Sequence, residues 1–378
     1  MPNATLDDIV HTGPGTLGGR YLRSFWQPVA TAESLAPGTA IPIRVMSEMY
    51  TLYRGTDGAA HTLTPRCPHR GTRLSTGRVE GDALRCFYHG WKFDGDGACI
   101  EAPAERMGFC DTVRVRSYPT QEYLGLIFAF LGEGDAPPLP RYPELEDEGV
   151  LEVSEPVVWP CNYFNRLENS VDPVHLPFVH GDSEFSEAGL GDVPEVSGEE
   201  TGFGISTSAK RPNGAVRVTH FHMPNINYLK DPPKENSLGW VEHLSWRVPV
   251  DDESCVSYVM QLAHVTGAAA EEYRERRKRK LEKARTTASA TMLGPRVLEG
   301  SLRIDDIEDR TFIVNLQDYV AQVGQGTIAD RDDERLGRSD RVVLLMRKIF
   351  LRELQALADG RPLKHWHRSE RVLATVGV

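Results

Sequence analysis

Two short boxes of cysteine and histidine constrain this chain more than any other feature. Cys67-Pro-His69 and Cys86-Phe-Tyr-His89 each offer one thiolate and one imidazole, and sixteen residues (70–85) separate them. A Rieske [2Fe–2S] centre requires two cysteines on one iron and two histidines on the other. The ligand types and their spacing therefore predict such a cluster, held by Cys67, His69, Cys86 and His89.

Two other interpretations of the boxes compete with the cluster. Two cysteines and two histidines can also hold a structural zinc ion. Finger-type zinc sites, however, pair cysteine with cysteine and histidine with histidine, whereas each box here mixes the two residue types. The remaining alternative is coincidence, with buried thiols and hydrogen-bonded core histidines, and the spacing disfavours it.

Composition excludes several classes of protein. The chain has 378 residues, 40% of them hydrophobic and 26% charged, with a net charge of −11. This acidity disfavours binding to nucleic acid or to an anionic membrane. No apolar run approaches the length of a transmembrane helix, and the first fifteen residues do not form a signal peptide. The six cysteines lack the spacing of a disulfide framework, which favours a reducing, cytoplasmic location.

The coarse pattern along the chain predicts a β-rich head followed by a larger α+β body. Short segments at 40–45, 49–53 and 61–63, bounded by Gly, Asp or Pro, indicate small antiparallel sheets. The apolar run 125–131 predicts a closing strand, and the Pro/Gly-rich segment 132–143 predicts a linker. Further strands are expected in the body at 153–160, 202–209, 216–223, 241–248 and 255–264.

Two helices are expected in the second half of the body. Residues 271–285 are charged almost throughout, which favours a solvated helix or mobile excursion over a binding role. A later helix has an apolar stripe that includes Val342, Met346 and Ile349. Ser339 is its predicted N-cap, and Gly360 follows its end.

A second metal site is predicted in the stretch ENSVDPVHLPFVH. Asn169, Asp172 and His175 step by three residues and can share one face of a helix that Pro173 bends, and His180 follows. Two imidazoles and one carboxylate form the facial triad of non-haem Fe(II) oxygenases. An isolated pair of this spacing is more often two hydrogen-bonded helix histidines, but a Rieske centre in the same chain needs an electron acceptor.

These motifs resemble a known family. The boxes CPHRG and CFYHGW, the following KFDGDG and the later Asn-x-x-Asp-x-x-His-x₄-His are similar to Rieske non-haem iron aromatic ring-hydroxylating oxygenases. GPGTLGGRYLRSFWQPV, WRVPVDD and QDYVAQVGQGTIADRDDERLGRSD resemble the branch of phthalate dioxygenase and vanillate O-demethylase. The resemblance implies a segment 1–26 that packs with the catalytic domain, a Rieske domain at 27–135 and a catalytic helix-grip (START-like) domain at 136–378.

The resemblance also implies the ligands of the mononuclear iron. His175 and His180 would bind it, and the third ligand of this branch falls on Asp318. Asp330 and Glu334 are rival carboxylates, but they lie in a charged, turn-like run. Asp318 has apolar neighbours in the chain, where a carboxylate needs a metal or a charged partner.

In the family, the aspartate that matches Asp172 is a bridge and not a ligand. It joins a Rieske histidine, here His89, to an iron histidine, here His175, and its two hydrogen bonds would fix both tautomers. The bridge crosses between subunits of a head-to-tail homotrimer with C3 symmetry. Asn169 would lie beside the iron.

The implied activity is that of a terminal oxygenase component. An NAD(P)H-dependent reductase, with or without a ferredoxin, would supply electrons for the reaction of O₂ with a small aromatic substrate. We expect ring (di)hydroxylation of an acidic substrate; O- or N-demethylation and, in another class, a pure Rieske electron-transfer protein are the alternatives. Guanidinium groups suit a carboxylate, so Arg211 and Arg217, which flank a predicted strand, are candidate substrate residues. The neighbouring His222 and Asn225 complete the candidate pocket, although the two arginines can equally face solvent.

Overall fold

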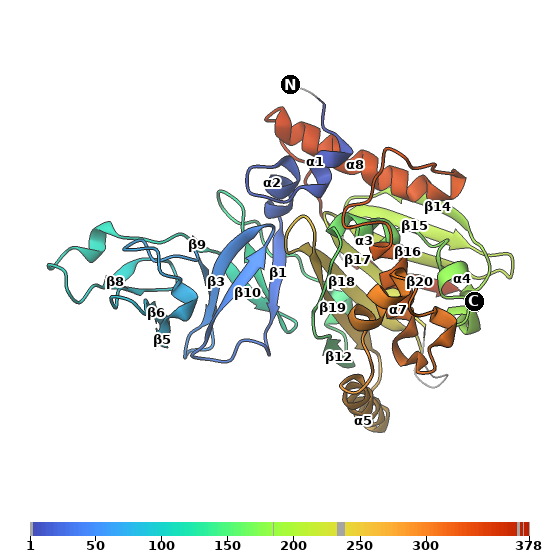
Figure 1. Cartoon of the computed structure of the whole chain (residues 1–378), viewed down its shortest axis with the longest axis horizontal. Coiled ribbons are helices and arrows are strands. Elements are labelled where there is room, and N and C mark those ends of the chain that lie inside the picture. Colours follow the sequence, from blue (N-terminus) through green and yellow to red (C-terminus); the bar gives the residue numbers. More distant parts are fainter. Residues whose placement is uncertain (1–2, 184, 233–238, 369–370, 373, 378) are drawn as a thin grey trace. The chain divides into compact units, whose positions relative to one another are not determined.

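The computed structural model describes residues 3–183, 185–232, 239–368, 371–372 and 374–377 and divides into two compact units (Figure 1). The first, called the head, comprises residues 11–141 with 248–251. The second, called the body, comprises the described residues of 1–10, 142–247 and 252–378. The head is built on β-sheets, and the body combines one antiparallel sheet with helices, so the predicted α+β class is confirmed.

The head contains three small antiparallel sheets, with strand orders β1-β11-β10, β2-β3-β4-β9 and β5-β6-β7-β8. The segments predicted at 40–45, 49–53 and 61–63 are β2, β3 and β4, and the apolar run at 125–131 is β11, which is buried along its whole length. The strands are β1 (Trp26–Thr31), β2 (Ala40–Val45), β3 (Glu48–Arg54), β4 (Ala60–Leu63), β5 (Arg78–Glu80), β6 (Ala83–Arg85), β7 (Lys92–Phe93), β8 (Cys99–Glu101), β9 (Ser117–Tyr118), β10 (Thr120–Tyr123) and β11 (Leu126–Phe130).

Residues 11–26 belong to the head, whereas the sequence analysis expected all of 1–26 to pack with the catalytic domain. The guanidinium of Arg23, on helix α2 (Leu17–Arg23), explains the difference. It donates hydrogen bonds to the carbonyls of Thr12 and Met46 and forms an ion pair with Glu48 at 2.8 Å. These bonds tie the segment to the hairpin of β2 and β3. Helix α1 (Leu6–Val10) belongs to the body and packs against α3 and α8.

The body is organised on one antiparallel sheet of order β12-β19-β18-β17-β16-β15-β14, with β13 paired to β19 and β20 to β16. The strands β14 and β17 were not predicted, because their sequences carry little apolar alternation. The body strands are β12 (Val150–Val153), β13 (Val157–Trp159), β14 (Glu195–Glu200), β15 (Gly204–Lys210), β16 (Val216–His222), β17 (Ile226–Asp231), β18 (Val241–Pro249), β19 (Cys255–Ala263) and β20 (Thr375–Gly377).

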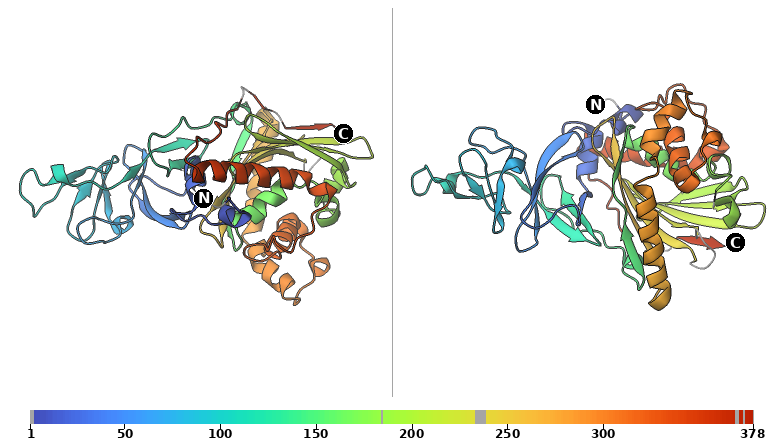
Figure 2. Two further views of the ribbon diagram at one scale, coloured as in Figure 1. Left: turned by 90° about the horizontal axis from the view of Figure 1, so that it is seen from above. Right: turned by 60° about the horizontal axis from the view of Figure 1, so that its bottom comes forward.

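Helix α8 packs against β14, and Figure 2 shows its long course within the body. It buries Val342, Met346, Ile349 and Phe350, the stripe expected from the sequence. The predicted cap was wrong: the N-cap is Asp340, and Ser339 lies inside a preceding 3₁₀ turn. The body helices are α1, α3 (Tyr163–Ser170), α4 (Leu176–Val179), α5 (Gly267–Ala284), α6 (Ala290–Leu298), α7 (Ile313–Val323) and α8 (Arg341–Ala358).

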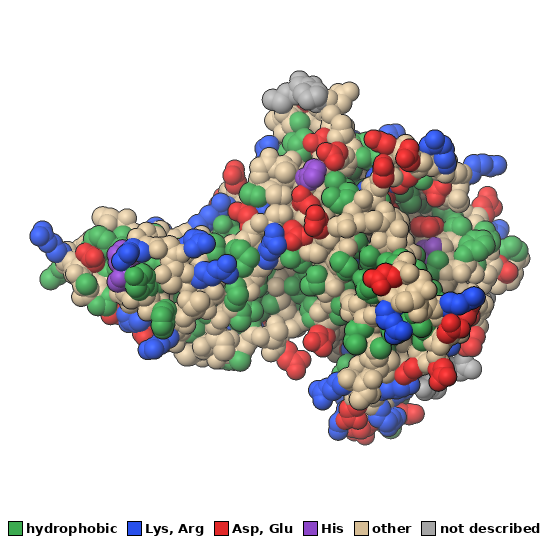
Figure 3. Space-filling model, in the orientation of Figure 1, with side chains coloured by type: hydrophobic (Ala, Val, Ile, Leu, Met, Phe, Trp, Pro, Cys, Tyr) green, Lys and Arg blue, Asp and Glu red, His purple; other side chains and the backbone are tan. Residues whose placement is uncertain are grey.

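The charged segment predicted at 271–285 forms helix α5. Most of its side chains are exposed, and basic and acidic groups alternate over it (Figure 3). Glu and Lys are strong helix formers, so this helix needs little burial to form. Within the described ranges, the helices lack the combination of length and apolar character that a bilayer span requires.

Candidate functional site: two metal centres

The two cysteine–histidine boxes form loops of the same design in the head. The second box lies between β6 and β7, where the Cys86 N–H bonds the Trp91 carbonyl at 2.8 Å and the Gly90 N–H bonds the Cys86 carbonyl. The first box repeats this pair of bonds around Cys67, with Gly71 in the place of Gly90. Both glycines have φ near +75°, which favours glycine. Each loop therefore closes tightly around its cysteine.

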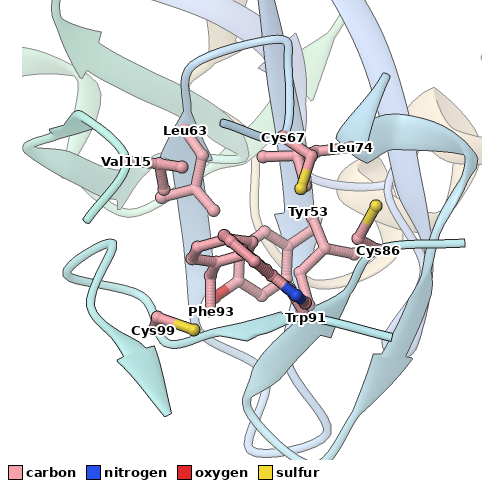
Figure 4. Close-up of a cluster of buried hydrophobic side chains, with 10 residues drawn as sticks. Tyr53, Leu63, Cys67, Leu74, Cys86, Trp91, Phe93, Cys99 and Val115 are labelled. Carbon is pink, nitrogen blue, oxygen red and sulfur yellow. The ribbon is translucent and has the colours of Figure 1, made fainter. Parts of the chain in front are cut away.

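The closed loops bring the four predicted ligands together. Both cysteines are 3% exposed, and their sulfur atoms lie near one another beside Trp91 (Figure 4). The rings of His69 and His89 have centroids 4.4 Å apart. The indole of Trp91 stacks on His69 at 4.5 Å with an interplanar angle of 6°, which fixes the orientation of that imidazole.

These residues fit a [2Fe–2S] cluster. Nδ1 of His69 is buried and has no hydrogen-bond partner among the described residues, a costly state for a polar atom unless a further group binds it. Burial raises the pKa of the Cys67 thiol to about 12. A thiolate in this place therefore needs a cation beside it, and the iron of a cluster supplies one.

A second pair of cysteines lies close by in the same unit. Cys99 on β8 and Cys110 have sulfur atoms 3.6 Å apart, and both are free thiols. This proximity could not be predicted, because a separation of eleven residues with no recurring motif carries no recognisable signal. Cys99 belongs to the same buried core as Cys67 and Cys86.

The histidines of the body lie on a broken helix and not on one bent helix, as the sequence analysis expected. Helix α3 ends at Ser170, and α4 begins at Leu176. Pro173 has no N–H to donate and disfavours helical geometry at the residue before it. His175 is consequently the N-cap of α4 and His180 its C-cap, so the two imidazoles flank a single short turn.

Helix α7 brings the carboxylate of Asp318 to these two histidines. The potential ligand atoms of His175, His180 and Asp318 all lie within 4.8 Å of one another. Nε2 of His180 is 3.3 Å from Oδ1 of Asp318. The rival carboxylates lie elsewhere: Glu334 accepts hydrogen bonds from Arg347, and Asp330 accepts one from the Asp332 N–H.

Both imidazoles are held through Nδ1. In His175 this atom is 2.6 Å from the Asp172 carbonyl oxygen, and in His180 it is 3.0 Å from Oε1 of Gln317. A carbonyl oxygen only accepts, so Nδ1 carries the proton and Nε2 keeps its lone pair for a metal. Burial lowers the pKa of His175, which favours the neutral, metal-binding form.

The three residues fit a mononuclear iron. Oδ1 of Asp318 is buried and lies 3.3 Å from Nε2 of His180. Burial opposes ionisation of Asp318, but the two imidazoles hold its pKa below the ordinary value. Two neutral imidazoles and one carboxylate on one side of a site are the ligands of non-haem Fe(II) oxygenases.

The carboxylate of Asp172 does not hydrogen-bond His175 in this structure. Oδ2 of Asp172 is 3.8 Å from Nδ1 of His175, and Oδ1 accepts from the Val174 N–H at 2.8 Å. The backbone carbonyl of Asp172 makes the bond that the resemblance assigns to its side chain. Asn169, in the last turn of α3, lines the cavity beside the histidines.

A cavity of about 610 Å³ opens onto the three residues. Apolar side chains, among them Trp159, Leu176, Leu229 and Val259, supply much of its wall. One face of α5 also lines the cavity, through Leu281 and its neighbours. The charged helix thus contributes to the site, contrary to the expectation of a purely solvated segment.

One of the four predicted substrate residues lies in the cavity wall. Arg217 on β16 lines the cavity, whereas Arg211, His222 and Asn225 do not. Successive strand residues point to opposite faces, so His222 points away from the cavity and stacks on Tyr142. Arg211 lies beyond the end of β15 in a buried turn, and Asn225 donates to the Arg247 carbonyl at 2.9 Å.

Strand β18 contributes cavity residues that were not predicted from the sequence. His243 and Arg247 line the cavity from this strand, together with Asp231 of β17. Nδ1 of His243 is 2.7 Å from Oδ2 of Asp231. The sequence His-Leu-Ser-Trp-Arg-Val alternates polar and apolar residues. This alternation indicates a strand with one polar face and is the signal that could have identified His243 and Arg247.

Comparisons with known proteins identify the Rieske domain of the head and the family of the whole chain. The model of the Rieske [2Fe-2S] domain matches residues 25–119. The oxygenase subunit of phthalate 4,5-dioxygenase from Pseudomonas putida is 31% identical over 90% of this chain and 83% of its own length. The chain belongs to the Rieske oxygenase alpha subunits. The oxygenase subunit of 5,5'-dehydrodivanillate O-demethylase from Sphingobium sp. (strain NBRC 103272 / SYK-6) is 30% identical over 95% of this chain and 81% of its own.

A solved structure supports the fold of this Rieske oxygenase. The NdmA QL mutant with caffeine, from Pseudomonas putida CBB5, matches with a TM-score of 0.68 at 22% identity, over 90% of this chain and 93% of that one. The Rieske oxygenase subunit is an oxidoreductase whose cofactors are a Rieske [2Fe–2S] cluster and a mononuclear non-haem iron.

Proposed function

We propose that the chain is the terminal oxygenase component of a multicomponent system that hydroxylates an acidic aromatic substrate, by ring (di)hydroxylation. Cys67, His69, Cys86 and His89 hold the cluster, and His175, His180 and Asp318 hold the mononuclear iron. The cluster supplies electrons and the iron supplies O₂ activation. The observation that carries this proposal is a single cavity that contains both the three predicted iron ligands and the guanidinium of Arg247.

Arg247 is suited to bind a carboxylate. Its Nε and Nη1 are buried and have no hydrogen-bond partner among the described residues. Burial lowers the pKa of Arg247 to about 9, since the charged form lacks solvation. A carboxylate in the cavity would restore that solvation through two charge-assisted hydrogen bonds. Arg217 adds a second cation that is already partly paired: Nη2 donates to the Lys230 carbonyl at 2.6 Å and lies 4.0 Å from Oδ1 of Asp231, whereas Nε has no hydrogen-bond partner among the described residues.

The remaining cavity wall suits an aromatic ring. Apolar side chains surround the ligands, and a ring anchored by its carboxylate would leave one edge facing His175 and His180. The two relatives described above carry names that refer to aryl carboxylic acids, phthalate and dehydrodivanillate. Charge, cavity wall and these names support the proposal of an aryl acid as the substrate class.

Demethylation is the second candidate reaction. The observation that favours it is the 30% identity to an O-demethylase subunit over nearly the whole chain. The same residues would serve both reactions, because the outcome depends on which substrate carbon faces the iron. The shape of the cavity around the substrate, and not the ligand set, would decide between them.

We further propose that electrons arrive from an NAD(P)H-dependent reductase, directly or through a ferredoxin, and pass between subunits of a C3 homotrimer. Phe87 and Tyr88, next to His89, are 67% and 52% exposed and offer an apolar surface beside the cluster loop. Oδ2 of Asp172 would accept a hydrogen bond from His89 of a neighbouring copy, while the Asp172 carbonyl holds His175.

Iron content tests the class of protein. We expect about three irons per chain, two in the cluster and one in the body, and a Rieske EPR signal on reduction. A count of two irons would leave a Rieske electron-transfer protein and refute the oxygenase proposal. A colourless protein with zinc in place of iron would refute the cluster as well.

Product identification tests the reaction. The protein, supplied with a reductase and NADH, would be incubated with benzoate, phthalate and a methoxybenzoate, and O₂ uptake would be compared with product formed. A cis-diol or phenol from benzoate or phthalate supports hydroxylation. Formaldehyde from the methoxybenzoate supports demethylation. Uncoupled O₂ uptake with all three acids would contradict an aryl acid as the substrate.

A further inference from the structure

A row of side chains connects the ring of His180 with the protein surface. Nδ1 of His180 is 3.0 Å from Oε1 of Gln317, and Nε2 of Gln317 is 3.0 Å from Oδ1 of Asp182. Asp182 in turn forms an ion pair with Arg310. His180 and Gln317 are 2% and 7% exposed, whereas the side chain of Asp182 is 54% exposed.

The hydrogen bonds of this row can run in one direction only. A carboxylate accepts and cannot donate, so the amide nitrogen of Gln317 must face Asp182. The amide oxygen of Gln317 then faces His180 and needs a proton on Nδ1. Nε2 of His180 is therefore left with its lone pair, 3.3 Å from Oδ1 of Asp318. Two acceptor atoms that face each other repel unless a positive charge lies between them, and a metal ion bound at Nε2 would supply that charge.

We propose that Asp182 is a positioning residue: through Gln317 it fixes the tautomer and the ring orientation of His180, so that Nε2 is presented to iron. This inference rests on the proposed function, which places iron at His180. Asp182 would touch neither iron nor substrate. Its part is to set which end of the Gln317 amide faces the imidazole, an orientation that an uncharged neighbour would not impose.

The two iron histidines therefore differ in how they are held. The Nδ1 of His175 bonds a backbone carbonyl, that of Asp172, which no substitution can remove. The Nδ1 of His180 depends on three side chains, of which the last, Arg310, lies partly in solvent. Loss of partners behind a metal-bound histidine typically lowers metal affinity or activity by about 10- to 100-fold. Substitution of the groups behind the ligands should therefore affect the position of His180 more than that of His175.

The test compares the affinity for ferrous iron in full-length variants. The protein would be stripped of mononuclear iron with a chelator that spares the cluster, then titrated with Fe(II) in competition with a chelating dye. We expect Asp182→Asn to lower Fe(II) affinity by about 10- to 100-fold. The EPR signal of the nitric oxide adduct of the bound Fe(II) should also change in anisotropy, while the signal of the reduced Rieske cluster should stay the same.

A double variant tests directly whether the direction of the hydrogen bonds matters. In Asp182→Asn with Gln317→Glu, the new carboxylate at 317 accepts from both the Asn amide and the His180 Nδ1–H, so the original direction returns. We expect Fe(II) affinity within about threefold of the wild type. If Asp182 had only a structural role, a second substitution that adds a buried charge would not restore Fe(II) affinity.

Asp305→Asn is the matched control. Asp305 also pairs with an arginine of the body, Arg303, but both side chains are largely exposed and lie outside the row. Its Fe(II) affinity should equal that of the wild type. If the wild type binds mononuclear iron, unchanged affinity in Asp182→Asn would overturn the inference. A lack of recovery in the double variant would overturn it as well. A wild-type protein with no iron beyond the cluster would instead overturn the proposed function and this inference together.

Discussion

The two candidate metal centres are built in different ways. In the head, four ligands come from two loops within 23 residues (67–89), and each loop is closed by the same two backbone hydrogen bonds. In the body, Asp318 lies 138 residues (318 − 180) beyond His180, on another helix. The first centre depends on local turn geometry, and the second depends on the packing of α4 against α7.

The two centres also differ in the groups that orient their histidine rings. The head orients His69 by stacking on the indole of Trp91. The body orients its histidines by hydrogen bonds, one to a backbone carbonyl and one to Gln317. A centre whose ligands come from one short stretch can therefore be recognised from a motif. A centre whose ligands are far apart in the sequence has to be checked against the residues that hold those ligands in the structure.

Removal of one ligand from each centre should produce the largest and most distinct effects. We expect Cys86→Ser to lose the whole cluster and retain about one iron per chain, because both irons share the same sulfide core. His180→Ala should lose only the mononuclear iron and retain about two. Iron analysis with EPR of the reduced protein measures both. Loss of the cluster signal in His180→Ala would show that the centres are not independently built.

Substitution of Asp172 should separate metal loading from electron transfer. We expect Asp172→Asn to keep both centres loaded, because the backbone carbonyl still holds His175, and to lower turnover by about 100-fold. Asp330→Asn, in the run of rival carboxylates, is the control and should keep wild-type turnover. Turnover of Asp172→Asn at the wild-type rate would refute the bridging role.

The predictability of each centre follows from its construction. The cluster ligands could be predicted from spacing alone, since a turn with glycine in the left-handed region is encoded within six residues (67–72). His175 and His180 could also be found, but the break at Pro173 was read as a bend because sequence does not show where the helical hydrogen bonds stop. Asp318 required a family resemblance to distinguish it from Asp330.

The cavity could not be predicted to the same degree. Which face of a strand looks inward depends on register and on the element that covers the sheet, and neither is local. His222 therefore points away from the cavity, Arg211 lies in a turn beyond β15, and Arg247, which was not a candidate, lines the cavity. Gln317 and Asp182 gave no signal, since each acts only through a neighbour in space.

A matched pair of arginine variants tests this conclusion about the cavity. We expect Arg247→Leu to raise the Kd for phthalate by about 10- to 100-fold, because two charge-assisted hydrogen bonds are lost. Arg247→Lys should recover only part of the affinity, since an ammonium lacks the planar fork. Arg211→Leu, outside the cavity, should leave the Kd unchanged. A larger effect at Arg211 than at Arg247 would place the substrate outside the cavity.

The smallest expected effect concerns acid stability, and it falls on the body. Glu200 accepts hydrogen bonds from Arg352 and Lys364, which lower its pKa from the ordinary 4.5 to about 2. The stabilisation is present above pH 4.5 and is lost as the pH falls toward 2. Because the pair is partly solvated, we expect Glu200→Gln to lower the free energy of unfolding at pH 7 by only about 1 kcal/mol.

Urea unfolding at pH 7, 4 and 3 would measure this effect. The difference between Glu200→Gln and the wild type should shrink as the pH falls, because protonation removes the same charge that the substitution removes. The pH at which the cluster is lost should be equal in the two proteins, since the cluster is held by its own loops in the head. A difference in unfolding free energy that grows toward pH 3 would have the wrong sign for a lowered pKa. A change in the pH at which the cluster is lost would show that the acid stability of the body governs that of the head.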